Sequence, residues 1–183
     1  MRPSPSRQLG ASLLEVLVAM LILSFGMLAL SGMLAYAVQM PKLAAYRAAA
    51  TSLAAGHIER MRANKDGFAL ESYKETMTYN VPLPPTVTLC VYPSCAPNSL
   101  AIRDKSETNQ AIRDQLPQGG MRVTCNGSCT DFDGDIWIIW QEPSTFAALN
   151  AASSDECPDP SATPTFTGFT SPEPRCLHVR FKL

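Results

Sequence analysis

The hydrophobic and polar positions of this chain are distributed unevenly. From Val16 to Val38, twenty-three consecutive residues carry no charge. The small or weakly polar residues that interrupt this run are Ser24, Gly26, Ser31, Gly32 and Tyr36. A soluble core helix would show a polar stripe at helical period, whereas about twenty apolar residues suffice for a helix to span a bilayer. The pattern therefore predicts a membrane-spanning helix near the amino terminus.

A helical pattern continues beyond this span as far as Lys65. One face of this outer part gathers the apolar side chains of Tyr46, Ala50, Leu53, Ala54, Ile58 and Met61. We expect Pro41 to kink the helix and Lys65-Asp66-Gly67 to end it. The apolar face of the outer half needs a sheet to cover it.

Three segments of the carboxyl-terminal half have the composition of β-strands, namely 121–125, 135–142 and 176–183. In the last segment, apolar and polar residues alternate, which predicts a half-buried strand. The run from Trp137 to Trp140 is apolar without alternation, as expected of a central strand that is covered on both faces. A long helix and a small antiparallel sheet together predict an α+β fold.

All six cysteines lie beyond the apolar span, in a region rich in Pro, Ser and Thr. They are Cys90, Cys95, Cys125, Cys129, Cys157 and Cys176. An even number of cysteines in such a region predicts disulfides in an oxidising compartment, so this part of the chain should lie outside the cytoplasm. Zinc is the alternative, but the local spacings are C-x4-C and C-x3-C rather than C-x2-C.

The pairing of the cysteines is open in principle, because six cysteines can pair in many ways. Each neighbouring couple borders a short turn or a single loop. We therefore expect local pairs: Cys90 with Cys95, Cys125 with Cys129, and Cys157 with Cys176.

The charge balance gives little reason to expect a polyanionic partner. Fifteen Lys and Arg against sixteen Asp and Glu give a formal net charge of −1. Basic residues gather only at Arg60, Arg62 and Lys65, so no nucleic-acid partner is expected. His57 and His178 lack the neighbours of a catalytic triad or a metal site. We place His57 on the helix flank and His178 on the polar face of a strand, and we expect no enzyme activity and no cofactor.

The acidic segment Asp131-Phe132-Asp133-Gly134-Asp135 has two interpretations. Asp131, Asp133 and Asp135 supply the oxygen ligands that calcium prefers. However, the segment lacks the glutamate and the flanking helices of an EF-hand, and Asp133-Gly134 is also a hairpin-turn dipeptide before a strand. The turn is the preferred interpretation, and no metal is expected.

The first ten residues, MRPSPSRQLG, are polar and basic and precede the apolar run. An ordinary secretory signal is instead cut after its apolar stretch. With ASLLEVLVA following Gly10, this segment resembles the class III leader of type IV prepilins. The resemblance implies that a prepilin peptidase cuts after Gly10, that Ala11 becomes the methylated amino terminus, and that Glu15 is the pilin glutamate. Ala11 stands where Phe is commonest.

The same resemblance implies a role for Glu15 and an organisation of the chain. In pilins the glutamate is thought to neutralise the amino terminus of a neighbouring subunit. The alternative is that Glu15 merely lies at the headgroup level of the bilayer. The implied regions are a leader (1–10), a transmembrane and assembly helix (11–40) and an extracytoplasmic pilin domain (41–183). The implied pilin fold packs the long helix on a small antiparallel sheet and closes a carboxyl-terminal loop with a disulfide.

Two further segments are similar to the PilV family of type IV pilus modification proteins, which are minor pilins. They are ERMRAN (59–64), and a helix after Cys95-Ala96-Pro97 that leads to LPQG (116–119) and a strand. The positions used in that helix are Leu100, Ala101, Asp104, Ala111 and Ile112. An amphipathic connector helix of another fold would show the same pattern.

This narrower resemblance implies a minor pilin of a priming or tip complex, with other minor pilins, the major pilin and an inner-membrane assembly platform as partners. The protein would lie in the inner membrane with its carboxyl-terminal domain in the periplasm, and later in a surface pilus. The rival is the minor subunit I of type II secretion pseudopilins, which shares LLEVLVA but is usually shorter with fewer cysteines.

Overall fold

The computed structural model describes residues 12–79, 81–83, 90, 94–142, 157–158 and 174–183. Its helices are α1 (Leu13–Ala63), α2 (Lys65–Ala69), α3 (Pro97–Gln115) and the 3-10 turn η1 (Cys129–Asp131). Its strands are β1 (Gly120–Cys125), β2 (Asp133–Trp140) and β3 (Arg175–Lys182). These elements confirm the α+β pilin fold that the sequence predicts. The chain divides into two compact units, Met1–Lys42 and Leu43–Leu183.

The part of α1 that belongs to the first unit is apolar on all sides. Its large hydrophobic side chains are exposed from Leu13 to Met40. The hydroxyl groups of Ser24 and Ser31 donate hydrogen bonds to backbone carbonyls one turn earlier, at 2.7 Å and 2.8 Å. Because these hydrogen bonds form within the helix, the hydroxyl groups need no water and are tolerated in lipid. Among the described residues, α1 is the helix long and apolar enough to cross a membrane.

The carboxyl-terminal end of α1 differs from the prediction. α1 ends at Ala63, and Lys65-Asp66-Gly67 do not end it but begin the short helix α2. The cause is Asn64, whose side-chain oxygen accepts a hydrogen bond from the Gly67 N–H at 3.3 Å and so caps the new helix. A side chain at Gly67 would lie 2.8 Å from the Pro97 carbonyl oxygen, so this close approach requires glycine.

In the second unit the three strands form one antiparallel sheet in the order β1-β2-β3. β2 is therefore central, as its continuous apolar run predicts. Ile136 and Ile138 face the main core, while Ile139 belongs to a smaller cluster with Tyr79 and Cys176. From Leu177 onward the predicted alternation is also confirmed, because the apolar positions pack on the core and His178, Arg180 and Lys182 are exposed.

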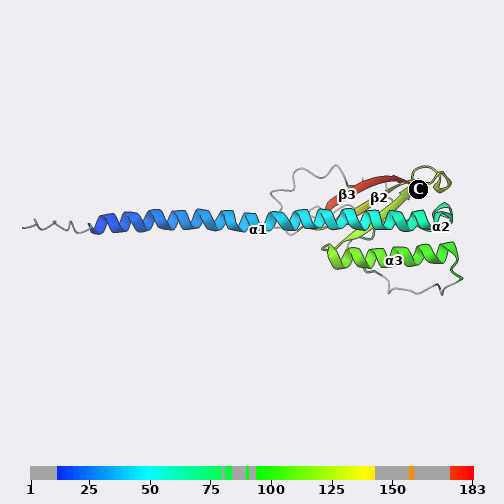
Figure 1. Ribbon diagram of the computed structural model, residues 1–183, viewed down its shortest axis with the longest axis horizontal. Helices are drawn as coiled ribbons and strands as arrows, with labels where there is room; N and C mark the ends of the chain where they lie inside the picture. Colours follow the sequence, from blue (N-terminus) through cyan, green and yellow to red (C-terminus); the bar gives the residue numbers. More distant parts are fainter. Residues whose placement is uncertain (1–11, 80, 84–89, 91–93, 143–156, 159–173) are drawn as a thin grey trace, which may run out of the picture. The chain divides into compact units, whose positions relative to one another are not determined.

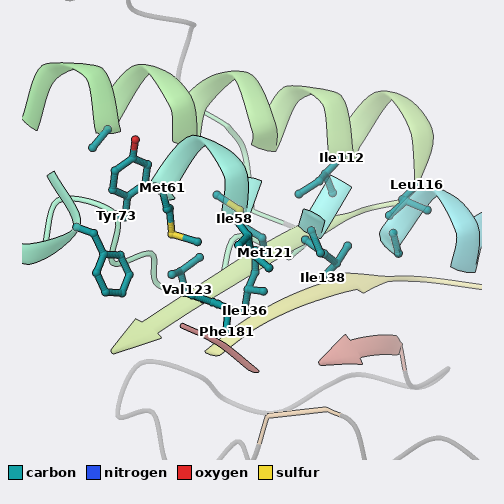
Figure 2. Packing of buried hydrophobic residues seen from close by; sticks show 14 of the residues in the cluster. Ile58, Met61, Tyr73, Ile112, Leu116, Met121, Val123, Ile136, Ile138 and Phe181 are labelled. Carbon is teal, nitrogen blue, oxygen red and sulfur yellow. The ribbon is translucent and has the colours of Figure 1, made fainter. Parts of the chain in front are cut away.

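Two helices cover one face of this sheet. α3 lies alongside the carboxyl-terminal part of α1 (Figure 1), and side-chain hydrogen bonds join them. Figure 2 shows the core between helices and sheet. Its buried members include Ile58, Met61, Ile112, Leu116, Met121, Val123, Ile136, Ile138 and Phe181. Of the apolar helix face that the sequence predicts, Ala50, Ala54, Ile58 and Met61 are buried, and Tyr46 and Leu53 pack against the same core.

A segment without regular structure covers the free edge of β1. Glu75 and Val123 exchange two backbone hydrogen bonds of 3.1 Å, and the Thr78 N–H donates to the Met121 carbonyl at 3.1 Å. This segment passes so close that a side chain at Gly120 would lie 2.2 Å from the backbone nitrogen of Tyr79. An open edge invites pairing with other chains, so this segment protects β1.

The six cysteines form three disulfides, Cys90–Cys95, Cys125–Cys129 and Cys157–Cys176, which are the local pairs that we expected. The last one joins the region after β2 to the start of β3. Cys157 and Cys176 pack with Ile139 on the sheet face opposite the helices.

The turn between β1 and β2 lies earlier than predicted. Asp133 and Gly134 are the first residues of β2, so the interpretation of this dipeptide as a hairpin turn is wrong. The reversal instead uses residues 126–132, with Gly127 at φ 81° and Phe132 at φ 57°. The Cys125–Cys129 disulfide closes this turn, and a cross-link of this kind can hold a turn without the usual dipeptide.

Candidate functional site

The first candidate site is the beginning of α1, where Glu15 lies in the first helical turn. The Glu15 side chain is exposed, as are those of Leu14 and Val16. Among the described residues no cationic side chain is paired with Glu15. A carboxylate in the first turn is favoured by the positive end of the helix dipole. Gly10 and Ala11 lie outside the described residues.

The surroundings of Glu15 are apolar on every side. Leu13 is 84% exposed, Leu14 72%, Val16 45% and Leu17 60%, and at about 100° per residue these neighbours of Glu15 lie on different sides of the helix. A surface of this extent is far larger than the apolar patches that soluble monomers expose. This apolar surface therefore requires lipid or the matching helices of other chains to cover it. Glu15 is the charged group within this apolar surface.

The second candidate site is a polar cluster between α1 and α3, which we call the α1–α3 seam. The Arg60 guanidinium donates to Glu107 at 2.6 Å and to Asp104 at 3.2 Å. The Tyr73 hydroxyl donates to the other oxygen of Asp104, and Asn64 donates to the Tyr73 oxygen at 3.2 Å. The bond from Arg60 lowers the pKa of Glu107, while burial raises the pKa of Tyr73.

The seam explains the ERMRAN segment in structural terms. Arg60 fastens α1 to α3, and Asn64 both caps α2 and donates to the Pro97 carbonyl at 2.8 Å. Glu59 pairs with Arg62 on the exposed side of the same segment. The seam was not predictable from the sequence, because Asp104 and Glu107 come more than forty positions after their partner Arg60.

His57 belongs to this seam, and its predicted place on the helix flank is wrong. Its side chain is 1% exposed, with Nδ1 2.9 Å from the Thr108 hydroxyl oxygen and the ring edge-on to Tyr73. Desolvation lowers the pKa of His57 to about 3, and the nearby charges of Arg60 and Lys105 add to this effect.

Two aspartates of the acidic segment lie in β2 and pair with side chains of β3. Asp133 pairs with Arg180 at 3.0 Å, and Asp135 lies 2.8 Å from His178. In the described part of the chain, no three His, Cys, Asp or Glu side chains are placed to hold a metal ion, Asp131 included. His178 is on the polar strand face, as the sequence predicts.

The comparison with known families concerns the first candidate site. Residues 5–31 match the prokaryotic N-terminal methylation motif, and this match contains Gly10, Ala11 and Glu15. The chain thus carries a type IV prepilin-like leader followed by an apolar helix suited to membrane anchoring, which makes it pilin-like. No curated protein and no solved structure gives a significant match.

Proposed function

We propose that this protein is a minor pilin with a structural role in the assembly of a type IV pilus, in an initiation, priming or tip complex. The observation that carries the proposal is the methylation motif at residues 5–31, which includes the start of an exposed apolar helix whose first turn holds Glu15. The folded α+β unit with its three disulfides supports it, because disulfides suit a domain outside the cytoplasm.

Processing is the first step of the proposed function. Prepilin peptidase removes residues 1–10 by cutting between Gly10 and Ala11, and Ala11 is then N-methylated. Residues 11–40 remain as the transmembrane and assembly helix, and residues 41–183 form the extracytoplasmic domain. Before assembly the protein is a single-pass protein of the inner membrane with its domain in the periplasm, and after assembly it lies in a cell-surface pilus.

Assembly depends on a charge pair between subunits. The carboxylate of Glu15 and the free ammonium of a neighbour's Ala11 are opposite charges at an apolar boundary, where each is costly to leave alone. Pairing offsets this cost only in one register, so it selects both the neighbour and its axial position. The partners are other minor pilins, the major pilin and the inner-membrane assembly platform. The role is structural, without catalysis or a cofactor.

The second candidate function is that of a type II secretion pseudopilin resembling subunit I. The methylation motif fits both classes. The length of 183 residues and the six cysteines favour the pilus, because those pseudopilins are usually shorter with fewer cysteines. The resemblance of ERMRAN and the α3 region to the PilV family points the same way.

The test is Glu15→Ala in the full chain, with Ser24→Ala as a matched control on the same exposed helix. Glu15→Ala lengthens the apolar run, so membrane insertion and leader cleavage should persist. Cross-linking to other minor pilins should fall by about tenfold or more, because the neighbour's ammonium loses its partner. Ser24→Ala should assemble normally, since the Ser24 hydroxyl bonds only within its own helix.

Surface piliation and type II secretion are measured in the same strains. Lost piliation with intact secretion supports the proposal. Intact pili with lost secretion assign the protein to the pseudopilins, and normal results in all assays remove the proposed role of Glu15.

A further inference from the structure

The sheet face that points away from the helices carries a row of three side chains. Arg122, Trp137 and His178 occupy directly opposite positions on β1, β2 and β3. The rings of Trp137 and His178 are stacked, with centroids 4.7 Å apart and planes 12° from parallel. The Arg122 guanidinium carbon lies 5.4 Å from the Trp137 ring centroid. We call these three residues the Arg122 row.

Arg122 is the residue of this row with unused binding capacity. It is partly buried, and burial lowers its pKa, but no carboxylate is paired with it among the described residues. The carboxylates on the same face already have partners, since Asp133 pairs with Arg180 and Asp135 with His178. The guanidinium therefore lies over an aromatic ring, and within the described ranges no side chain accepts a hydrogen bond from it.

We propose that the Arg122 row is a docking site for a carboxylate on an acidic protein partner. A guanidinium fork matches a carboxylate in shape and charge, and its place over the Trp137 ring restricts the side chain before binding. The identity of the partner as a neighbouring pilus subunit rests on the proposed function. Recognition of the carboxylate is a property of the folded domain alone.

The same geometry disfavours a nucleic-acid strand as the occupant. Single-stranded nucleic acids bind where bases stack on open aromatic faces along a basic groove. Trp137 lies between Arg122 and His178 on the neighbouring strands, so its faces are not open for stacking. Arg180 and His178 on this face already pair with Asp133 and Asp135, so they do not form a run of unpaired cations for successive phosphates. Charge complementarity therefore selects a single carboxylate rather than a polyanion.

The experiment uses the full chain in zwitterionic detergent micelles and three probes: an acetylated Gly-Glu repeat peptide, the matching Gly-Gln peptide and the matching Gly-Lys peptide. Binding is followed by NMR of the tryptophan indole and arginine side-chain signals. The Gly-Glu peptide should bind and the Gly-Gln peptide should not. Arg122→Gln should weaken the binding by about tenfold or more, because a charge-assisted hydrogen bond is lost.

Matched variants separate recognition from folding. Lys182→Gln removes a cation from the same strand face at a distance from the row and should leave binding unchanged within about twofold. Arg122→Lys should also bind more weakly, since an ammonium lacks the planar fork. Arg122→Glu should lose the Gly-Glu peptide and gain the Gly-Lys peptide, which a merely structural residue would not cause.

Three results would overturn the inference. They are equal binding of the Gly-Glu and Gly-Gln peptides, unchanged Gly-Glu binding in Arg122→Gln, and tighter binding of an oligothymidylate than of the Gly-Glu peptide. None of them bears on Glu15, because the peptide assay needs no pilus. Conversely, a failure of Glu15→Ala to impair assembly would leave the peptide result standing and would remove only the identity of the partner.

Discussion

The burial of His57 predicts that the domain loses stability in mild acid. In the folded state the pKa of His57 is lowered from 6.5 to about 3, chiefly by desolvation. The unfolded chain therefore takes up this proton first, and stability falls as the pH drops below 6.5. Between pH 7.5 and pH 5.5 the linkage relation gives a loss of about 1.4 kcal/mol. This value hardly depends on the folded pKa, as long as that pKa stays below about 4.5.

Other titrating groups of the domain act mainly at lower pH. The pKa of Glu107 is lowered from 4.5, so its contribution to acid instability appears below that pH. Burial raises the pKa of Glu75, so protonation of Glu75 favours the folded state and acts with the opposite sign. A pH range that ends at 5.5 therefore isolates the effect of His57 on stability best. Any effect of Glu75 persists in a variant that lacks His57, so the comparison with that variant removes it.

The assay is urea unfolding of the full chain in detergent micelles, with disulfides intact, followed by tryptophan fluorescence at several pH values. The wild-type protein should lose about 1.4 kcal/mol between pH 7.5 and pH 5.5. His57→Gln keeps a polar partner for Thr108 but does not titrate, so most of this loss should vanish. His178→Gln removes the exposed histidine and should retain the loss. An equal loss in wild type and His57→Gln would show that His57 is not the source of the acid sensitivity.

Three further predictions concern stability. Gly120→Ala should cost about 1–3 kcal/mol in urea unfolding, because its side chain would lie 2.2 Å from the segment that covers β1, whereas Gly56→Ala meets no atom within 4 Å and should not destabilise. The double change Cys157→Ser and Cys176→Ser should cost about 3 kcal/mol, and non-reducing peptide mapping that finds Cys157 joined elsewhere would contradict the pairing. Asp104→Asn should cost about 1.5–3 kcal/mol, since it removes the charge that holds the seam, and an unchanged unfolding midpoint would count against that role.

The elements with a regular apolar period could be predicted from the sequence. The helix that begins near Leu13 follows from an uncharged run long enough to span a bilayer. The strand around Ile136 follows from a continuous apolar run, and the strand around Val179 from the alternation that burial of one face imposes. The leader and Glu15 were recognisable because they belong to a short contiguous motif. Contiguous signals of this kind need no knowledge of which distant segments meet.

The features that depend on distant segments could not be predicted. His57 is polar, with exposed Gly56 before it and buried Ile58 after it, so its burial against Thr108 depends on where α3 packs. Asp133 belongs to a strand instead of a turn because Arg180 and the backbone of β3 pair with it. Likewise, Arg122 meets Trp137 only because the register of β1 and β2 places them opposite each other. The role of each of these residues can be assigned only when the tertiary fold is known.

Mass spectrometry of this subunit's amino terminus in pili sheared from the cell surface tests whether the protein is a processed pilus subunit. We expect a peptide that begins at Ala11, with its α-amino group methylated, in the pilus fraction. A chain that begins at Met1, a chain cut after the apolar span, or the absence of the protein from the pilus fraction would contradict this expectation.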